Sequence, residues 1–171
     1  MAQQISVGSS LPSNVTLKYC PYDAELQNAC GIPQNLELDR FKDKKVVIVG
    51  VPGAFTPTCN NTHLPEFHAH YEDLKKKGVE EVIFVTTSDP FVMDAWGKWT
   101  KTNDKIIMAA DGNGEFLSAM GLIQDLTSVG FGAVRSKRFA LVADHLKVTY
   151  LGVESGHGVS VSGVKAVLEA L

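Results

Sequence analysis

The feature that most constrains this chain is an apolar strand that leads directly into the start of a helix. Residues 46–51 are almost all aliphatic, which is typical of a strand buried on both faces. After a short turn, Thr56 suits the N-cap of a helix and Pro57 suits its first position. Cys59 then lies in the first helical turn, where unpaired backbone N–H groups and the positive end of the helix dipole converge. The sequence therefore predicts a thiol placed where its thiolate form is stabilised.

The helix start alone does not account for a fully reactive cysteine. A free thiol has a pKa of about 8.5, and making it mostly thiolate at neutral pH takes a shift of roughly 2 units, or about 3 kcal/mol. A helix N-terminus supplies about 0.3–1 kcal/mol and at best about 2. We therefore expect a second cationic partner, preferably an arginine, from elsewhere in the chain. The alternative interpretation treats Cys59 as a small buried apolar residue and Thr56 as a cap alone.

The residues from Pro52 to Cys59 resemble the peroxidatic-cysteine signature of the peroxiredoxins. The core pattern Pro-x-x-x-Thr-x-x-Cys is met by Pro52, Thr56 and Cys59. The flanking residues are similar to the peroxiredoxin-5 subfamily, and within it to the fungal alkyl hydroperoxide reductase type, which includes several fungal allergens. The resemblance covers nearly the whole chain. Residues 89–97 resemble the next helix of the family, and residues 136–142 resemble the strand that carries its catalytic arginine.

The resemblance implies a role for each residue of this pattern. Cys59 would be the peroxidatic cysteine, which attacks the O–O bond of a hydroperoxide and becomes a sulfenic acid. Thr56 would hydrogen-bond the thiolate or the peroxide, and Arg138 would supply the missing positive charge while binding the peroxide oxygens. Pro52 would shape the pocket and shield the sulfenic acid from water. Without the resemblance, Arg138 is better interpreted as a solvated cation at a strand end, and Pro52 as a turn residue.

Turnover requires a second thiol that condenses with the sulfenic acid. The animal type of peroxiredoxin-5 carries this thiol near the C-terminus, where residues 158–162 of this chain contain no cysteine. Cys30 lies in a segment that resembles the resolving-cysteine loop of the fungal type, in which the disulfide forms between subunits. The neighbouring Gly and Pro predict a surface loop, and a bond to Cys59 requires Cα atoms within about 7 Å, so we expect local rearrangement. A structural Cys30 remains the alternative, and Cys20 is expected to be structural.

Length and composition fit one domain that spans residues 1–171. With 171 residues, 44% hydrophobic and 20% charged, the chain is ordinary for a globular protein. Alternating strands and helices followed by a hairpin and a helix suit an α/β, thioredoxin-like fold with a central mixed sheet flanked by helices. Strands are expected at 15–20, 45–51, 81–87, 105–110, 138–143 and 147–153, with a strand or irregular piece at 36–41. Helices are expected at 57–77, kinked at Pro65 and ended by Gly78, and at 90–101. A short helix is expected to end at about Met120, a loop to follow at 121–134, and a last helix to run from a cap at Ser160 to the C-terminus.

Charge and cysteine content limit the partners and the compartment. A net charge of −3 gives no basic surface for nucleic acid, and no apolar run approaches the roughly 20 residues of a membrane span. Three cysteines cannot close a disulfide framework, and the first residues lack the pattern of a secretory signal. We therefore expect the cytosol. A peroxisomal or mitochondrial location is the alternative, although the last three residues are not the peroxisomal Ser-Lys-Leu signal.

Other candidate chemistries are weaker. The five histidines lack metal-ligand spacing, His63 is expected near the pocket entrance, and Arg135 and Lys137 are interpreted as solvated cations. A thioredoxin-type oxidoreductase needs Cys-x-x-Cys, which the chain lacks. A cysteine hydrolase would need a histidine base matched to Cys59.

These observations and the resemblance together favour one activity. We expect a thiol peroxidase for hydrogen peroxide and small alkyl hydroperoxides that uses no bound cofactor and no metal. The resemblance implies a homodimer and thioredoxin as the reductant, with glutathione or glutaredoxin as alternative reductants. The other interpretation is a redox sensor or holdase that binds protein clients when oxidised.

Overall fold

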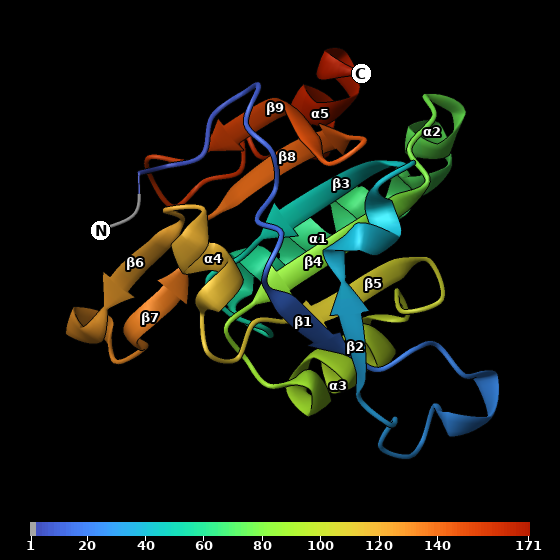
Figure 1. The fold of residues 1–171 in the computed structure, drawn as a ribbon. Coiled ribbons are helices and arrows are strands. Elements are labelled where there is room, and N and C mark those ends of the chain that lie inside the picture. Colours follow the sequence, from blue (N-terminus) through green and yellow to red (C-terminus); the bar gives the residue numbers. More distant parts are fainter. Residues whose placement is uncertain (1–2) are drawn as a thin grey trace.

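The structure is a computed structural model that describes residues 3–171, and a mixed sheet forms its centre (Figure 1). Its strand order is β2-β1-β5-β4-β3-β8-β9. The three central strands β3, β4 and β5 run parallel, and antiparallel strands flank them on both sides. This is the predicted α/β architecture with a central mixed sheet. The strands are β1 (Thr16–Tyr19), β2 (Gln34–Glu37), β3 (Lys45–Gly50), β4 (Glu81–Thr86), β5 (Ile106–Ala110), β8 (Phe139–Asp144) and β9 (Lys147–Val153).

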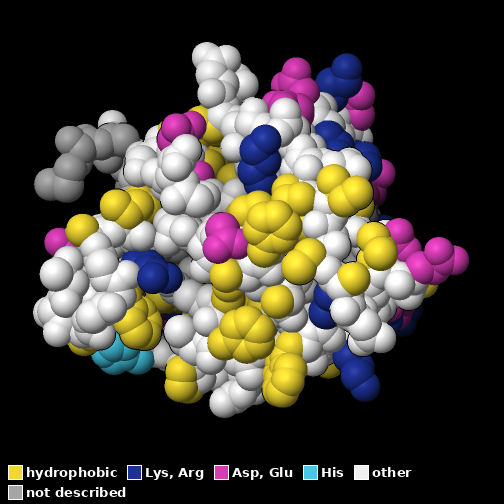
Figure 2. Space-filling model, turned by 90° about the horizontal axis from the view of Figure 1, so that it is seen from below, with side chains coloured by type: hydrophobic (Ala, Val, Ile, Leu, Met, Phe, Trp, Pro, Cys, Tyr) yellow, Lys and Arg dark blue, Asp and Glu magenta, His cyan; other side chains and the backbone are white. Residues whose placement is uncertain are grey.

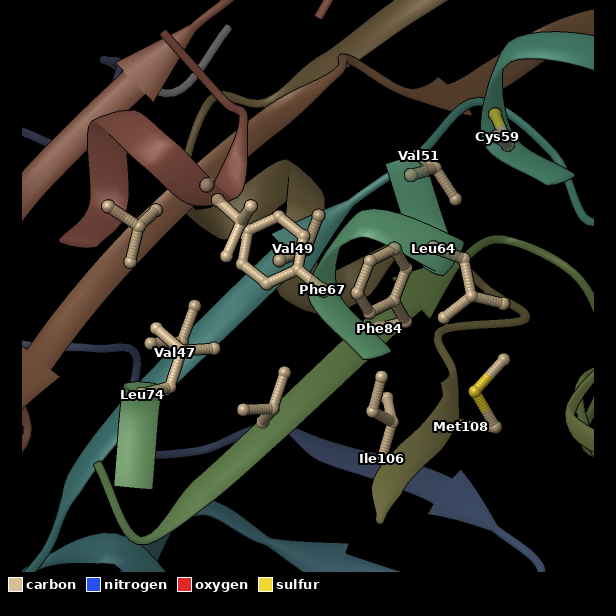
Figure 3. Packing of buried hydrophobic residues seen from close by; sticks show 14 of the residues in the cluster. Val47, Val49, Val51, Cys59, Leu64, Phe67, Leu74, Phe84, Ile106 and Met108 are labelled. Atoms are coloured by element: carbon tan, nitrogen blue, oxygen red, sulfur yellow. The ribbon is translucent and has the colours of Figure 1, made fainter. Parts of the chain in front are cut away.

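Both faces of the sheet are covered, which explains why β3 is apolar from Val46 onward. Successive side chains of a strand point to opposite faces, so Val47 and Val49 join one core cluster while Val46 and Ile48 join the other. Figure 3 shows Val47, Val49 and Val51 in a row that leads toward Cys59. The first cluster lies under the helices α1 (Leu64–Ala69), α2 (Tyr71–Lys76), α3 (Pro90–Thr100) and α5 (Val164–Ala170), and the second under α4 (Glu115–Ala119) and the 3₁₀ turn Leu38–Phe41.

The helix that carries Cys59 is interrupted, although one continuous helix from 57 to 77 was predicted. It opens at Pro57, widens into a π-helical turn at Cys59–His63, continues as α1, and breaks at His70 before α2. Proline has no N–H and its ring clashes with the carbonyl four residues earlier. The π turn before Pro65 avoids both problems, because its wider bond runs from the Leu64 N–H to the Cys59 carbonyl. The distortion therefore precedes Pro65 instead of following it, and the helix ends at Gly78 as predicted.

Two predictions for the second half of the chain were wrong. The predicted loop at 121–134 contains a second, two-stranded sheet of β6 (Ile123–Leu126) and β7 (Gly132–Ser136). Its strands are short and only one of their residues is fully buried, so they carry no apolar alternation that the sequence could show. The last helix begins at Val164 after Gly163, and Ser160 does not cap it. Ser160 instead hydrogen-bonds Glu154 through both its backbone N–H and its hydroxyl.

No helix within residues 3–171 has the length and apolar character needed to cross a membrane.

Candidate active site

Strand pairing brings the two halves of the site together. In the antiparallel pair of β3 and β8, Gly50 at the end of β3 lies opposite Phe139. A Cβ at Gly50 would lie 2.0 Å from the Phe139 ring, so only glycine allows this ring to pack across the strand end. Arg138 directly precedes β8, and the segment that leads to Cys59 leaves β3 at the same edge. The sheet register therefore places a cation beside the helix start although 79 residues separate the two in the chain.

Arg138 contacts the sulfur of Cys59 directly. Its Nη2 donates a hydrogen bond to Sγ at 3.3 Å, and both side chains are buried. A buried guanidinium keeps its charge at all physiological pH values and presents several donors in a fixed plane. It is therefore the cationic partner that the sequence requires, and it stabilises negative charge on the sulfur and on an oxygen close to it.

His63 holds the other branch of the Arg138 guanidinium. The His63 Nε2 lies 2.8 Å from the carbonyl oxygen of Ser162, which only accepts, so the ring proton is on Nε2. Nδ1 is then free to accept from Arg138 Nη1 at 3.2 Å. Burial lowers the pKa of His63 to about 4, and the Arg138 charge acts in the same direction. His63 is thus a neutral acceptor at pH 7.

The position of His63 corrects the sequence interpretation. It is fully buried between Arg138 and the aromatic rings of Phe67 and Phe84, and does not lie at a pocket entrance. Its four-residue spacing from Cys59 was the available signal, because residues four apart share a helix face. The spacing indicates a role in the site only because Arg138 lies beside both Cys59 and His63.

Glu154 completes a closed set of hydrogen bonds around Arg138. Its backbone N–H donates to the Arg138 carbonyl at 2.9 Å, and its Oε1 accepts from the N–H and the hydroxyl of Ser162, both at 2.8 Å. Burial opposes ionisation of this carboxyl, but the hydrogen bonds from Ser160 and Ser162 outweigh it and lower the pKa of Glu154. The ionised Glu154 fixes Ser162, whose carbonyl orients His63, which in turn holds Arg138.

Thr56 and Pro52 lie on the loop above Cys59. The Thr56 hydroxyl donates to the Gly53 carbonyl at 2.8 Å, so its remaining lone pairs are available as acceptors. Pro52 presents its carbonyl to Arg135 Nη1 at 3.4 Å, and Arg135 Nε also donates to the Phe131 carbonyl at 2.6 Å. Arg135 therefore ties this loop to β7 and its turn. The interpretation of Arg135 as a merely solvated cation was wrong.

A groove of about 690 Å³ opens over this arrangement. The polar side of the groove is lined by Pro52, Thr56 and Arg138. The structure therefore brings these three predicted residues together above Cys59. The β6–β7 hairpin that the sequence did not reveal supplies an apolar wall, formed by Leu126, Val129 and Phe131.

Cys30 lies apart from these residues. It is exposed on the connection between β1 and β2, in a hollow of about 460 Å³ formed with α3. All three cysteines are free. Burial, followed by the nearby Asp94 carboxylate, raises the pKa of Cys20 to about 11, so this thiol is a poor nucleophile at neutral pH. Cys20 thus has the surroundings of a structural cysteine.

Within residues 3–171, no group of three or more histidine, cysteine or acidic side chains is arranged to hold a metal ion.

The structure combines a thioredoxin-like sheet, a buried cysteine at a helix start and an arginine that contacts the cysteine sulfur. This combination defines a class of thiol-dependent redox proteins. The sequence model of the redoxin family matches residues 6–168. The chain belongs to this family, and within it to the peroxiredoxins, which are thiol-dependent peroxidases acting on hydroperoxides.

Individual relatives support this placement. The chain is 52% identical over 128 residues to Peroxiredoxin-2B of Arabidopsis thaliana, covering 75% of this chain and 78% of the relative. It is 44% identical over 153 residues to a Malassezia furfur protein that carries the name peroxiredoxin, covering 88% and 91%. Among solved structures it resembles reduced Prx3 of Vibrio vulnificus in complex with hydrogen peroxide, with a TM-score of 0.86, 38% identity and coverage of 98% and 99%. The predicted fold and family are thereby confirmed.

Proposed function

We propose that the chain reduces hydrogen peroxide and small alkyl hydroperoxides with Cys59 as the peroxidatic residue. The observation that carries this proposal is the hydrogen bond from Arg138 Nη2 to Cys59 Sγ. It joins a thiol at a helix start to a buried cation, and these two sources of thiolate stabilisation together exceed what a helix start provides alone. The likeness to a structure that contains hydrogen peroxide supports the substrate class.

The chemical step is a displacement on oxygen. The Cys59 thiolate bonds to the terminal oxygen of the hydroperoxide, the O–O bond breaks, and the second oxygen leaves as hydroxide or alkoxide, which takes up a proton. Arg138 stabilises the charge that develops on both oxygens. The Thr56 hydroxyl, whose proton is committed to Gly53, accepts from the hydroperoxide O–H and so orients it. Pro52 closes the loop side of the groove and limits access of water to the sulfenic acid.

Cys30 is the proposed resolving cysteine. Its thiol condenses with the Cys59 sulfenic acid to give a disulfide and water, and thioredoxin, or alternatively glutathione with glutaredoxin, reduces that disulfide. Cys59 is fully buried and Cys30 lies on the far side of α3, so within one chain both segments have to move before the sulfurs meet. The structure is compatible with a bond within one chain or between two.

An exposed apolar surface supports the proposed homodimer. Phe91, Val92 and Trp99 of α3 are exposed, and Phe55 of the Cys59 loop is exposed as well. Figure 2, which shows the molecule from below Figure 1, displays many hydrophobic side chains gathered on one face. Contiguous apolar surface of this kind is typical of a protein–protein contact.

The cytosol remains the proposed location, because three free cysteines suit a reducing compartment. Relatives carry peroxisomal and chloroplastic names, so the family occupies more than one compartment.

The function is tested by peroxide consumption with thioredoxin and its reductase as the electron supply. We expect turnover in the wild type and in Cys20→Ser, and a loss of at least about 10³-fold in Cys59→Ser, because the nucleophile is removed. Replacing thioredoxin by glutathione and glutaredoxin in the same assay identifies the reductant. Peroxide consumption that survives in Cys59→Ser would contradict the proposal.

A further inference from the structure

The loop that carries Cys30 is held to the rest of the molecule by polar contacts and not by fully buried side chains. It comprises residues 20–33, all of them described, and none of these side chains is fully buried. The loop therefore has little apolar packing to hold it, and such segments open at low free energy unless polar contacts restrain them. The polar contacts nearest to Cys30 come from one pair of charged side chains on α3.

Asp94 and Lys98 form that pair, which we call the α3 clamp. Lys98 Nζ lies 2.7 Å from Asp94 Oδ2, and the side chains are only 13% and 6% exposed, respectively. Lys98 Nζ also donates to the carbonyl of Ala29 at 2.6 Å, and Asp94 Oδ2 accepts from the N–H of Gly31 at 2.9 Å. The clamp thus grips the backbone on both sides of Cys30 with charge-assisted hydrogen bonds, which are the stronger kind.

The clamp holds Cys30 on the wrong side of α3 for the reaction. Asp94 and Lys98, together with Phe91, form the face of α3 that lines the Cys30 hollow. Met93 and Trp96 form the opposite face, in the core cluster that contains Cys59. The Trp96 indole N–H even donates to Asn60, the residue after Cys59. The helix therefore separates the two thiols of one chain while the clamp is closed.

We propose that the α3 clamp is a positioning device that restrains Cys30 in the reduced protein and so limits the rate of disulfide formation. This inference rests on the proposed role of Cys30. In the step concerned, the Cys30 sulfur attacks the sulfur of the Cys59 sulfenic acid, the S–OH bond breaks, and the hydroxide leaves as water with the proton from Cys30. For a bond within one chain, Ala29 and Gly31 have to be released from the clamp before this step, and a closed clamp lengthens the lifetime of the sulfenic acid.

The main test is the double variant Asp94→Asn/Lys98→Met, which removes both charges and leaves no lone buried charge behind. The matched control is Asp73→Asn/Lys76→Met, which makes the same changes in an exposed pair of α2. Two quantities are measured. One is hydrogen–deuterium exchange of residues 27–33 in the reduced protein. The other is the rate of disulfide formation after one equivalent of hydrogen peroxide is added. Samples are quenched with acid at intervals, and the disulfide is measured by mass.

We expect faster exchange in residues 27–33 and disulfide formation about tenfold faster in the clamp variant, with the control unchanged. A second variant, Gly31→Ala, leaves α3 intact in case the double variant fails to fold. A Cβ at Gly31 would lie 2.7 Å from the Cys20 Cβ, so the loop has to shift away, and we expect acceleration in the same direction.

Three outcomes would overturn the inference, and they are distinguishable. Unchanged disulfide formation in both variants would show that the clamp does not limit the step. Slower formation would show that the clamp presents Cys30 instead of restraining it. A wild type that stops at the Cys59 sulfenic acid would remove the proposed role of Cys30, and with it this inference, while leaving the role of Cys59 intact.

Discussion

Cys59 and Cys30 are both free thiols, but the structure surrounds them in opposite ways. Cys59 is buried where β3, its helix and Arg138 meet, and a closed set of hydrogen bonds through His63 and Glu154 fixes its partner. Cys30 is exposed on an irregular loop whose backbone on both sides of Cys30 is bound by the Asp94–Lys98 ion pair of α3. The first arrangement favours a fixed geometry for the attack on a peroxide, and the second allows a thiol to leave its place.

In this fold, the reactivity of one thiol and the mobility of the other depend on different kinds of contact. The sheet register and the hydrogen bonds through His63 and Glu154 together set the Cys59 surroundings, so Cys59 leaves its place only when the start of its helix opens locally. The Cys30 surroundings depend on the few polar contacts of the α3 clamp, so they open locally once those contacts break, without disturbing the buried core.

The largest expected effect comes from breaking the fixed site at Arg138. In Arg138→Lys the ammonium cannot contact both Cys59 and His63 in the planar geometry of a guanidinium. We expect the second-order rate constant for peroxide to fall about 10²–10³-fold, as for loss of a preorganised donor. The measurement is the rate of Cys59 oxidation in single-turnover stopped flow. Arg135→Lys serves as control and is expected to lose far less, because Arg135 bonds only backbone carbonyls.

The next effect is a pH dependence of stability caused by His63. Its pKa is about 4 in the folded chain, below the ordinary value of 6.5, so the unfolded chain binds more protons between these values. Stability should therefore fall as the pH drops from about 6.5 to about 4, by up to about 3 kcal/mol from this group. Urea unfolding across this range measures it. In His63→Gln, which does not titrate, this share of the pH dependence should vanish, and an identical dependence in both proteins would show that His63 does not cause it.

A smaller effect is expected on activity when the acceptor for Arg138 is lost. His63→Leu leaves Arg138 Nη1 without its partner, so we expect about a tenfold lower rate of Cys59 oxidation. His63→Gln, which can still accept and donate, should restore part of this loss. Equal rates in His63→Leu and the wild type would show that Arg138 needs no support from His63.

Much of the Cys59 side could be predicted because it depends on local sequence. The apolar run of β3 and the proline at the first helical position are signals confined to a few residues. The side-chain cap predicted at Thr56 is replaced by another contact, because its hydroxyl donates to the Gly53 carbonyl. A helix dipole alone is too weak to make a thiol mostly ionised at neutral pH, so a cation was expected, and the family resemblance assigned this role to Arg138.

The remaining parts depend on contacts between distant segments. His63 acquires its role only because Ser162 and Arg138 approach it from other elements. The β6–β7 wall has too little burial to leave a pattern. The grip of Lys98 on the Cys30 loop joins backbone and side chain 69 residues apart, for which a single sequence carries no signal.

In the proposed reaction, Cys59 is oxidised first by the peroxide and Cys30 reacts second with the Cys59 sulfenic acid. The wild type and Cys30→Ser are each treated with one equivalent of hydrogen peroxide, and then analysed by intact mass and by gel mobility without reductant. We expect the wild type to form a Cys30–Cys59 disulfide and Cys30→Ser to gain one oxygen at Cys59 at the same rate. A Cys59 that stays reduced while the peroxide persists would contradict the account.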